Sequence, residues 1–520
     1  MNRRPNHHLP SILVTGASGF IGRHFLEAAK NRFKIYGLSR AISDRSMIPK
    51  HPNIQWIDAD IGNFFYLHSA LSDLRVQGGV DYVVHLASFY DFNYDENPEY
   101  MRTNIVGTKN ILEESRRLNI KRFIFASSLA ACDFSKGQII NEQSPADADF
   151  WYARSKREGE ELVKSLSHEF PGANCRFAAT FSDWCEYGPL YVFLNTWLSN
   201  GWKSPILGGK GKSAITYIHA NCLVRFLLRI ITISDDLPRI GTYIASPNEP
   251  VSHRELFIRA TRFYFGETKK PVFMPKSIAA LGVYGMDLFG KITGKRPFEK
   301  PWMMRYIDKQ LRVDSRQTRN ILDWEPTERY TIKRRLLYMT ERMKSYPYEW
   351  HKRNARMLKT IQLPSNFLLY EALDTVREPV IDKIIEYLVN DENKERFLNY
   401  RLLHHTTLRK DLTAIYQFLS ASVRGHDRMS MLAYARQLAF VRSRQGFPFE
   451  EVRDALSVFN TVVREELKSL PMLEGLEQFV YDEITLTFQL MIDELEGGYE
   501  DAEKELTQDT PTAQSSGILE

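Results

Sequence analysis

The sequence predicts a doubly wound parallel α/β sheet with a small additional α/β part, followed by an all-α helical bundle. From residue 9 to about residue 322, short apolar runs alternate with amphipathic segments, which is the pattern of parallel strands joined by helices. Beyond residue 350 the strand-like runs disappear, and apolar residues recur at steps of three and four. A chain of 520 residues is too long for one compact domain, so two domains are expected.

The strands and helices of the first part are predicted from runs of apolar residues and from amphipathic spacing. The predicted strands are Ile12–Thr15, Lys34–Leu38, Ile54–Ile57, Tyr82–Leu86, Arg122–Ser127 and Asn174–Ala178. The predicted helices between them are about Ile21–Lys30, Asn97–Leu118 and Tyr152–Leu166.

A glycine-rich turn joins the first predicted strand to the first predicted helix, with the sequence Thr-Gly-Ala-Ser-Gly-Phe-Ile-Gly over residues 15–22. Gly16 permits a tight turn, Gly19 lets the backbone approach a pyrophosphate, and Gly22 lets the helix pack closely on its strand. The helix N-terminus adds unpaired N–H groups and a partial positive charge. This stretch predicts a dinucleotide phosphate site, although an ordinary glycine-rich turn shares the pattern.

Composition argues against several classes of function. The net charge of +5 is small, and no basic stripe interleaves with aromatic residues, so no nucleic-acid partner is expected. The four cysteines lack metal-ligand spacing, so we expect reduced thiols, no metal site and a cytoplasmic location. The polar N-terminus lacks the apolar core of a signal peptide. The longest apolar stretch, Ile278–Phe289, is too short to span a bilayer, which leaves attachment to a membrane surface open.

A tyrosine and a lysine four residues apart, Tyr152 and Lys156, are the candidate catalytic pair. On a helix they share one face, with Cβ atoms roughly 5–6 Å apart. A free tyrosine has a pKa of about 10, and a neighbouring ammonium group favours its phenolate. Such a tyrosine exchanges a proton with a substrate oxygen while a hydride moves at the adjacent carbon. The pair alone is common on helix surfaces, but it is rare behind a glycine-rich nucleotide turn.

Several motifs occur in one order along residues 9–340. They are residues 15–22, Asp60-Ile61, His85-Leu86-Ala87, residues 104–108 (Asn-Ile-Val-Gly-Thr), Ser127-Ser128, residues 152–156 and Tyr187-Gly188-Pro189. Together they resemble the extended short-chain dehydrogenases/reductases, the NAD-dependent epimerase/dehydratase family. The resemblance implies a Rossmann core over about residues 9–180 and a substrate-binding part over about residues 181–345.

The resemblance also implies roles for individual residues. Ser128 would orient the reacting oxygen toward Tyr152, with Ser127 as the competing candidate. Lys156 would grip the nicotinamide ribose and lower the pKa of Tyr152, and Asn104 would support the active-site helix. The implied cofactor-binding residues are Gly16, Ser18, Gly19, Phe20, Ile21, Gly22, Ser39, Arg40, Asp60, Ile61, Leu86, Ala87, Ser88, Asn104, Ser127, Tyr152 and Lys156.

The choice of cofactor depends on the end of the second predicted strand, where a carboxylate would bind the adenosine ribose of NAD(H). This chain has Ser39 and Arg40 there, with Arg45 close behind. A guanidinium is a bidentate phosphate ligand, so NADP(H) is favoured over NAD(H). The alternative is that Arg40 stacks on adenine or faces solvent.

Two departures from the family pattern limit the choice of substrate. Dehydratase members have an acidic pair after the active-site hydroxyl residue, whereas Leu129 and Ala130 stand here, which disfavours dehydration. Residues 181–186 look inserted before the Tyr-Gly-Pro motif. His219 is expected to be structural. Aromatic residues crowd the substrate side at Trp184, Tyr187, Tyr191, Phe193, Trp197 and Trp202, which leaves room for a hydrophobic or ring-shaped substrate.

The last third of the chain is predicted to form a helical bundle over residues 367–500, after a linker at 346–366 and before a disordered tail at 501–520. Its apolar stripes are Val452, Leu456, Phe459, Val463 and Leu467, and Ile484, Phe488, Met491 and Leu495. Residues 434–456 weakly resemble the helical sensor domains of bacterial stressosome co-antagonists. A homodimer, or a protein partner bound through the bundle, is expected.

Two hypotheses about function follow. The first is an NAD(P)-dependent oxidoreductase or epimerase that acts at an alcohol or ketone carbon of a sugar nucleotide or hydrophobic ring. The second is an NADP(H)-binding regulatory protein that signals through its bundle. The retained tyrosine, lysine and serine favour the enzyme.

Overall fold

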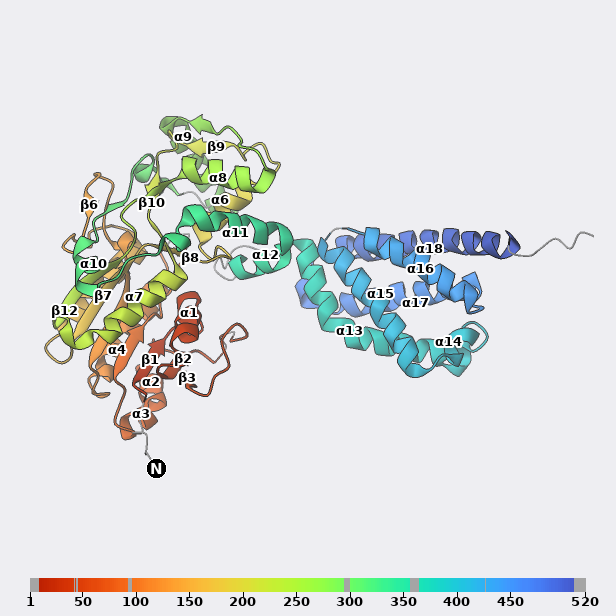
Figure 1. The fold of residues 1–520 in the computed structure, drawn as a ribbon, viewed down its shortest axis with the longest axis horizontal. Helices are drawn as coiled ribbons and strands as arrows, with labels where there is room; N and C mark the ends of the chain where they lie inside the picture. The colour runs from red at the N-terminus through yellow and green to blue at the C-terminus, as the bar shows by residue number, and fades with distance from the viewer. Residues whose placement is uncertain are drawn as a thin grey trace, which may run out of the picture. The chain divides into compact units, whose positions relative to one another are not determined.

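The computed structural model describes residues 9–41, 43, 45–91, 96–293, 300–355, 364–425 and 427–508. It divides into two units, Met1–Thr360 and Ile361–Glu520. The first contains a seven-stranded parallel sheet flanked by helices, and the described part of the second is helical (Figure 1). The predicted fold class is therefore confirmed. No helix within the described ranges is both long enough and apolar enough to cross a membrane.

The bounds of the elements in the first unit are as follows. The strands are β1 Ser11–Thr15, β2 Lys34–Ser39, β3 Ile54–Asp58, β4 Tyr82–His85, β5 Arg122–Ser128, β6 Ile139–Ile140, β7 Gly172–Phe177, β8 Ala179–Phe181, β9 Ile206–Gly208, β10 Ala214–Ile215, β11 Tyr217–His219, β12 Ile240–Ala245, β13 Val251–Ser252, β14 Val272–Met274 and β15 Arg312–Val313. The helices are α1 Phe20–Ala29, α2 Phe64–Ala70, α3 Ser72–Val76, the π-helix η1 Tyr100–Val106, α4 Gly107–Ser115, α5 Trp151–Ser165, α6 Gly188–Trp197, α7 Ala220–Thr232, α8 His253–Phe265, α9 Lys276–Thr293, α10 Arg316–Leu322, α11 Ile332–Ser345 and α12 Pro347–Ala355.

The main sheet has the strand order β12-β7-β5-β4-β1-β2-β3, and all its pairs are parallel. Because successive side chains of a strand point to opposite faces, Ile12 and Val14 of β1 enter one core with α1 and α7. Leu13 enters the other core with α2 to α5. The chain order reverses between β1 and β4, which is where open α/β sheets bind their ligands, at the carboxyl ends of the strands.

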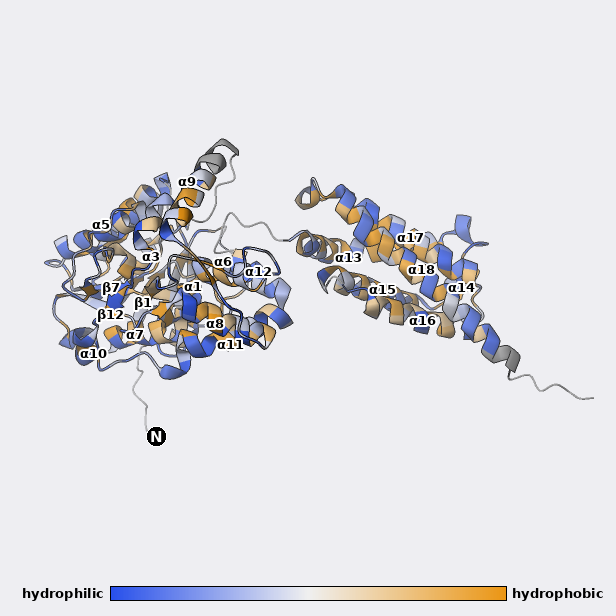
Figure 2. Ribbon diagram, turned by 90° about the horizontal axis from the view of Figure 1, so that it is seen from above, coloured by the Kyte–Doolittle hydropathy of each residue, from blue (hydrophilic) through white to orange (hydrophobic). Residues whose placement is uncertain are grey.

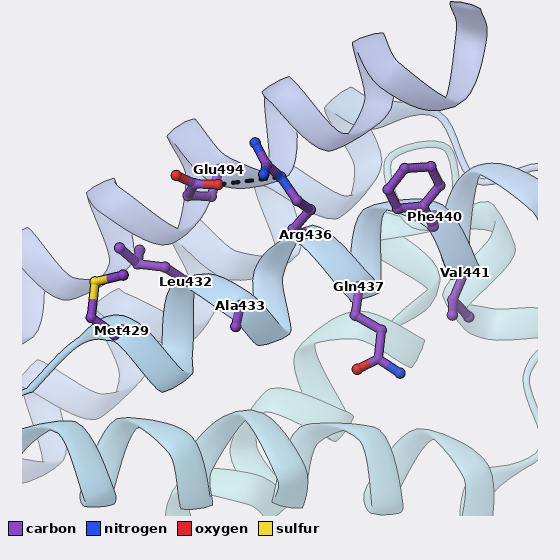
Figure 3. A pocket seen from close by; sticks show the side chains of 8 residues that line it. All are labelled: Met429, Leu432, Ala433, Arg436, Gln437, Phe440, Val441 and Glu494. Atoms are coloured by element: carbon purple, nitrogen blue, oxygen red, sulfur yellow. Dashed lines mark ion pairs between the residues drawn. The ribbon is translucent and has the colours of Figure 1, made fainter. Parts of the chain in front are cut away.

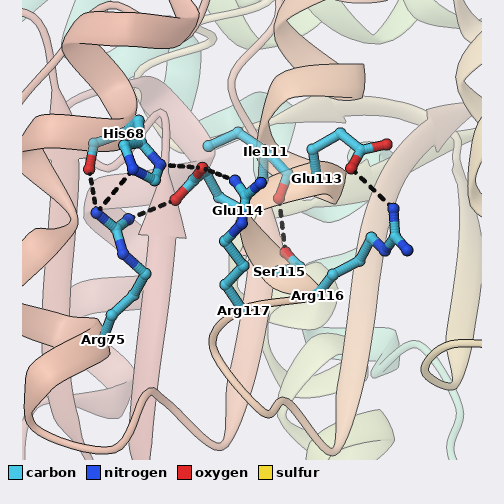
Figure 4. A network of polar contacts seen from close by, with 8 residues as sticks. All are labelled: His68, Arg75, Ile111, Glu113, Glu114, Ser115, Arg116 and Arg117. Atoms are coloured by element: carbon cyan, nitrogen blue, oxygen red, sulfur yellow. Dashed lines mark hydrogen bonds and ion pairs between the residues drawn. The ribbon is translucent and has the colours of Figure 1, made fainter.

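A buried carboxylate ties three helices together on the α2 to α5 face (Figure 4). Glu114 of α4 is completely buried and lies 2.8 Å from Nδ1 of His68. It also accepts from Arg75 at 2.6 Å and from Arg117 at 2.8 Å. A buried carboxylate is tolerated only when its oxygens are paired in this way, so the network fixes α2 and α3 against α4.

The structure differs from the predicted elements in three places. The predicted helix Asn97–Leu118 begins as the π-helix η1 and continues as α4. The strand β12, at the edge of the sheet, was not predicted. Nine of the 21 residues of the expected linker at 346–366 form the helix α12, whose Trp350 and Asn354 are buried.

The second unit contains α13 Ser365–Val389, α14 Leu398–Leu402, α15 His405–Gly425, α16 Met429–Arg444, α17 Phe449–Lys468 and α18 Glu477–Gln508. All members of the two predicted apolar stripes on α17 and α18 are buried in one core, where these helices pack together (Figure 2). Because α18 continues to Gln508, the first eight residues of the predicted disordered tail are helical. Residues 509–520 lie outside the described residues.

A pocket on the second unit lies between α16 and α18 (Figure 3). Its lining is Met429, Leu432, Ala433, Arg436, Gln437, Phe440, Val441 and Glu494. Arg436 and Glu494 form an ion pair across it at 3.6 Å. The pocket contains none of the residues that the sequence predicts for catalysis or cofactor binding.

Candidate active site

The glycine-rich turn has the geometry that a diphosphate requires. Gly16 has a φ of +66°, and a Cβ added there would lie 2.6 Å from the backbone nitrogen of Ala87. A Cβ on Gly22 would lie 2.3 Å from the Gly16 carbonyl oxygen. Both positions therefore require glycine. Gly19 caps α1 without a side-chain hydrogen bond, so the first N–H groups of this helix have no side-chain acceptor and fit an anion.

At the end of β2, Arg40, the residue expected to favour NADP(H), is exposed. It is Arg45 that donates to Ser39 Oγ at 2.9 Å and forms an ion pair with Asp58 at the end of β3. The Arg45 guanidinium also lies 4.2 Å from the ring centre of Trp56. The adenosine end of the site therefore holds an arginine whose charge is already partly balanced by a carboxylate.

Asp60, one of the residues expected to bind the cofactor, forms an ion pair with Arg102 of η1. Its Oδ1 also accepts from the Gly62 N–H at 2.9 Å. Burial acts in the opposite direction, yet these hydrogen bonds hold the pKa of Asp60 below its usual value. Of its neighbours in the motif, Ile61 is buried and accepts from Asn110 through its carbonyl oxygen at 2.8 Å.

The buried His85 at the end of β4 connects Thr15, where the glycine-rich turn begins, to Thr108 of α4. Thr108 Oγ1 donates to the Asn104 carbonyl at 2.6 Å, so it accepts from Nε2 of His85, 2.9 Å away. Nδ1 of His85 then accepts from Thr15 Oγ1 at 2.6 Å, and this hydroxyl accepts from the Ala87 N–H at 3.2 Å. Burial lowers the pKa of His85 to about 3, so the ring is neutral and serves as a structural bridge.

Asn104 holds two other parts of the site in place. Its Oδ1 accepts from the Phe89 N–H at 2.6 Å, and its Nδ2 donates to the Phe89 carbonyl at 3.0 Å. The same Nδ2 donates to Ser155 Oγ of α5 at 3.0 Å. Asn104 therefore positions the loop after β4, which contains Leu86 and Ser88, against the helix that bears Tyr152.

The candidate catalytic residues converge at the carboxyl end of β5. The Tyr152 hydroxyl is hydrogen-bonded to Ser128, the last residue of that strand. The Lys156 Nζ lies 5.5 Å from the Tyr152 ring centre and donates to the Ala126 carbonyl at 2.8 Å. Tyr90 covers the tyrosine, with ring centres 4.6 Å apart.

The electrostatics of this pair differ from the expectation that Lys156 lowers the pKa of Tyr152. Burial raises the pKa of Tyr152 to about 12, against the opposing hydrogen bond with Ser128. Burial also lowers the pKa of Lys156 to about 7, against the opposing charge of Glu160. The protein alone disfavours charge on both groups.

Ser127 points to the other side of β5. Its hydroxyl donates to Glu160 Oε1 at 2.5 Å, and both carboxylate oxygens of Glu160 accept from Arg176, at 2.8 and 2.9 Å. All three residues are buried. The Ser127 hydroxyl is therefore bound to Glu160, whereas Ser128 is hydrogen-bonded to Tyr152. The sequence alone does not distinguish these two serines.

The segment expected as an insertion, residues 181–186, forms a tight turn that reaches α1. Cys185 and Glu186 have φ angles of 72° and 53°, a strained conformation for residues other than glycine. The buried Glu186 carboxylate forms an ion pair with Arg23, which directly follows Gly22, and accepts from Ser182 Oγ at 2.5 Å.

Asn354 of α12 holds this turn from the other side. Its Oδ1 accepts from the Glu186 N–H at 2.8 Å, and its Nδ2 donates to the carbonyls of Trp184 and Trp350, each at 2.8 Å. Sequence reasoning missed Arg23, Glu186 and Asn354. The insertion before Tyr-Gly-Pro was the one feature of the sequence that pointed to an unusual structure at Glu186.

His219 is in a structural setting as expected. Its Nδ1 accepts from the Asn221 N–H at 3.1 Å, and its Nε2 lies 3.3 Å from Asp183. Asp183 is also bound by Arg335 of α11. Among the described residues, no group of three His, Cys, Asp or Glu side chains is arranged to hold a metal ion.

Comparison with known proteins agrees with this geometry. Residues 12–243 match the model of the NAD dependent epimerase/dehydratase family. A putative UDP-glucose 4-epimerase of Methanocaldococcus jannaschii is 27% identical over 242 residues, which are 44% of this chain and 76% of the relative. The N-acetyl-alpha-D-glucosaminyl-diphospho-ditrans,octacis-undecaprenol 4-epimerase of Escherichia coli O157:H7 is 24% identical over 292 residues, which are 55% and 82% of the two chains.

Two solved structures resemble the chain in fold. The structure of gox2253 has a TM-score of 0.51 at 20% identity and covers 65% of this chain and 98% of its own. The Bordetella bronchiseptica enzyme WbmG, in complex with NAD, has a TM-score of 0.50 at 17% identity and covers 66% and 96%. The family match lies in the first unit and adds no support for the stressosome resemblance of the second. Residues 12–243, within the N-terminal unit, are therefore similar to the NAD dependent epimerase/dehydratase family.

Proposed function

We propose that the N-terminal unit catalyses reversible hydride transfer at an alcohol carbon of a sugar nucleotide, as an epimerase or oxidoreductase with a nicotinamide cofactor. The observation that carries the proposal is the hydrogen bond of Tyr152 to Ser128, with Lys156 beside the ring and the glycine-rich turn at the same edge of the sheet. The relatives named as sugar-nucleotide or lipid-linked-sugar 4-epimerases support the substrate class.

In the proposed mechanism Ser128 holds the substrate hydroxyl toward Tyr152. The phenolate of Tyr152 accepts the hydroxyl proton as the C–H electron pair leaves the same carbon, which becomes a carbonyl. An oxidised nicotinamide, when bound, supplies the hydride acceptor and a positive charge that favours the phenolate. In the reverse direction Tyr152 returns the proton to the carbonyl oxygen, and the reduced nicotinamide would supply the hydride, to the opposite face of the carbonyl in an epimerase. Lys156, when protonated, would favour the phenolate and would hold the nicotinamide ribose.

The substitution Tyr152→Phe tests the mechanism. A panel of UDP-hexoses first identifies the substrate that the unmodified protein turns over. We expect the variant to turn over this substrate ~10²–10⁴-fold more slowly, because the proton carrier is lost while the ring still packs. Nuclear magnetic resonance measures epimer formation, absorbance at the nicotinamide band measures net oxidation, and calorimetry measures cofactor binding. Tyr66→Phe, at an exposed position of α2, is the matched control. Full activity of the Tyr152 variant would assign proton transfer to another group.

The preference for NADP(H) is also part of the proposal, supported by the two cations Arg40 and Arg45 near Ser39 and opposed by the carboxylate of Asp58. We expect calorimetry to give tighter binding of NADPH than of NADH. Arg45→Ala should reduce the difference by about tenfold, equivalent to about 1.4 kcal/mol. Arg116→Ala, on the surface of α4, is the control. Equal or tighter NADH binding by the unmodified protein would refute the preference.

A further inference from the structure

The helix α9 of the N-terminal unit exposes an apolar face. Ala279, Val283 and Asp287 are buried on one side of this helix. At 100° per residue, Ile278 and Leu281 lie on the opposite side, and they are 57% and 77% exposed. A face of this kind in a water-exposed helix calls for a partner, because soluble proteins rarely expose contiguous apolar patches.

Further observations show that the exposed face is open and broad. A Cβ added at Gly282 or Gly285 would meet no described atom within 4 Å. Tyr284 and Met286 flank the face, and both are exposed. Figure 2 shows orange, apolar segments along the coloured part of α9.

The apolar surface continues into the strand before the helix. Val272 and Phe273 of β14 are exposed, and β14 pairs in parallel with β9 (Figure 1). The Val272 N–H donates to the carbonyl of Pro205 at 2.7 Å, three residues after the exposed Trp202. Tryptophan is the residue that prefers the boundary between water and lipid. We call residues 199–215 and 266–287 the α9 lobe.

The charge around this surface is mainly positive. The α9 lobe contains six lysines: Lys203, Lys210, Lys212, Lys269, Lys270 and Lys276. Its two acids are Glu267 and Asp287, and Asp287 is buried. The neighbouring acid Asp308 accepts from the backbone N–H groups of Lys210 and Lys212. Five of the six lysines are exposed.

We propose that the α9 lobe docks the enzyme on an anionic lipid bilayer. An apolar helix face fringed by lysines binds at the boundary of headgroups and acyl chains, and each lysine adds attraction to anionic lipid. A second copy of the chain is disfavoured as the occupant, because it would bring its own lysines against these. The proposal does not depend on the reaction that the site catalyses.

Vesicle sedimentation of the full-length protein tests the proposal. Wild type should pellet with vesicles of phosphatidylcholine and phosphatidylglycerol, weakly with phosphatidylcholine alone, and less as salt is raised. Leu281→Asp should weaken binding at least ~10-fold, and so should Lys270→Glu combined with Lys276→Glu. Leu402→Asp is the matched control, since Leu402 of the second unit is also 77% exposed. Thermal denaturation checks that each variant is folded.

Three outcomes would overturn the proposal. Wild type that pellets with neither vesicle does not dock on lipid. Equal pelleting with both vesicle types would show that the protein does not recognise the anionic headgroup. Loss of a dimer in Leu281→Asp, seen by sedimentation velocity without any change in vesicle binding, would identify the face as a subunit interface.

Discussion

The two units of the chain bury their charged residues for different purposes. In the first unit, Glu160 pairs with Arg176 and Glu186 pairs with Arg23, while the buried Lys156 donates to a backbone carbonyl of β5. In the described part of the second unit, Arg442 and Glu451 are the buried charged residues. Burying charge near the candidate site lowers the stability of the first unit, whereas the packing of apolar stripes stabilises the second unit.

The two buried charges of the bundle illustrate the difference. Glu451 accepts from the backbone N–H groups of Asn399 and Tyr400, at the start of α14, at 2.8 and 3.1 Å. Arg442 forms an ion pair with Asp411 of α15 at 2.7 Å. Both contacts join one helix to another, so these charges serve packing, whereas Lys156 and Glu160 of the first unit lie on the helix that bears Tyr152.

The largest expected difference between the two units comes from a core truncation in the bundle. Phe459 is buried against Tyr416 and Phe488, with ring centres 6.2 and 5.4 Å away. Phe459→Ala should destabilise the second unit by about 3–5 kcal/mol through lost contacts and a cavity. Urea denaturation followed by circular dichroism measures the loss, and Leu402→Ala is the exposed control. A parallel loss of cofactor affinity would show that the bundle completes the active site.

A smaller effect is expected from Asn354, which joins α12 to the turn at Glu186. Asn354→Ala removes the side-chain partner of the Glu186 N–H and of the Trp184 carbonyl, which then keep only their contact with each other at 3.1 Å, at a cost of about 1–3 kcal/mol. We expect a lower Tm and, because Glu186 pairs with Arg23, weaker cofactor binding. The exposed Asn200→Ala is the control. An unchanged affinity would limit Asn354 to a structural role.

A third expected effect is a dependence of stability on pH. Burial lowers the pKa of Lys156 to about 7, whereas an unfolded lysine titrates near ~10.4. The unfolded chain therefore binds more protons between these values, so this lysine destabilises the fold fully below pH 7 and less as pH rises. Lys156→Met should stabilise the protein without cofactor, and the gain should shrink by at most about 1.4 kcal/mol per pH unit across that window. Denaturation at several pH values measures it. The exposed Lys109→Met should give no such trend.

Sequence by itself determined the features that depend on local pattern. The glycines at 16, 19 and 22 are dictated by backbone geometry, and the four-residue spacing of Tyr152 and Lys156 is a property of any helix. The apolar stripes of α17 and α18 follow from the same periodicity. Such features are visible in the chain because neighbouring residues alone specify them.

The tertiary structure decided what depends on distant partners. Ser127 and Ser128 are alternatives in sequence, but successive residues of a strand face opposite sides, and only the position of Glu160 shows which serine is engaged elsewhere. The pairing of Arg23 with Glu186 joins residues 163 positions apart. The pKa of Tyr152 rises because burial, which no spacing rule reports, outweighs its hydrogen bond. Long-range contact and solvent exclusion are properties of the packed chain, so they appear only when it is folded.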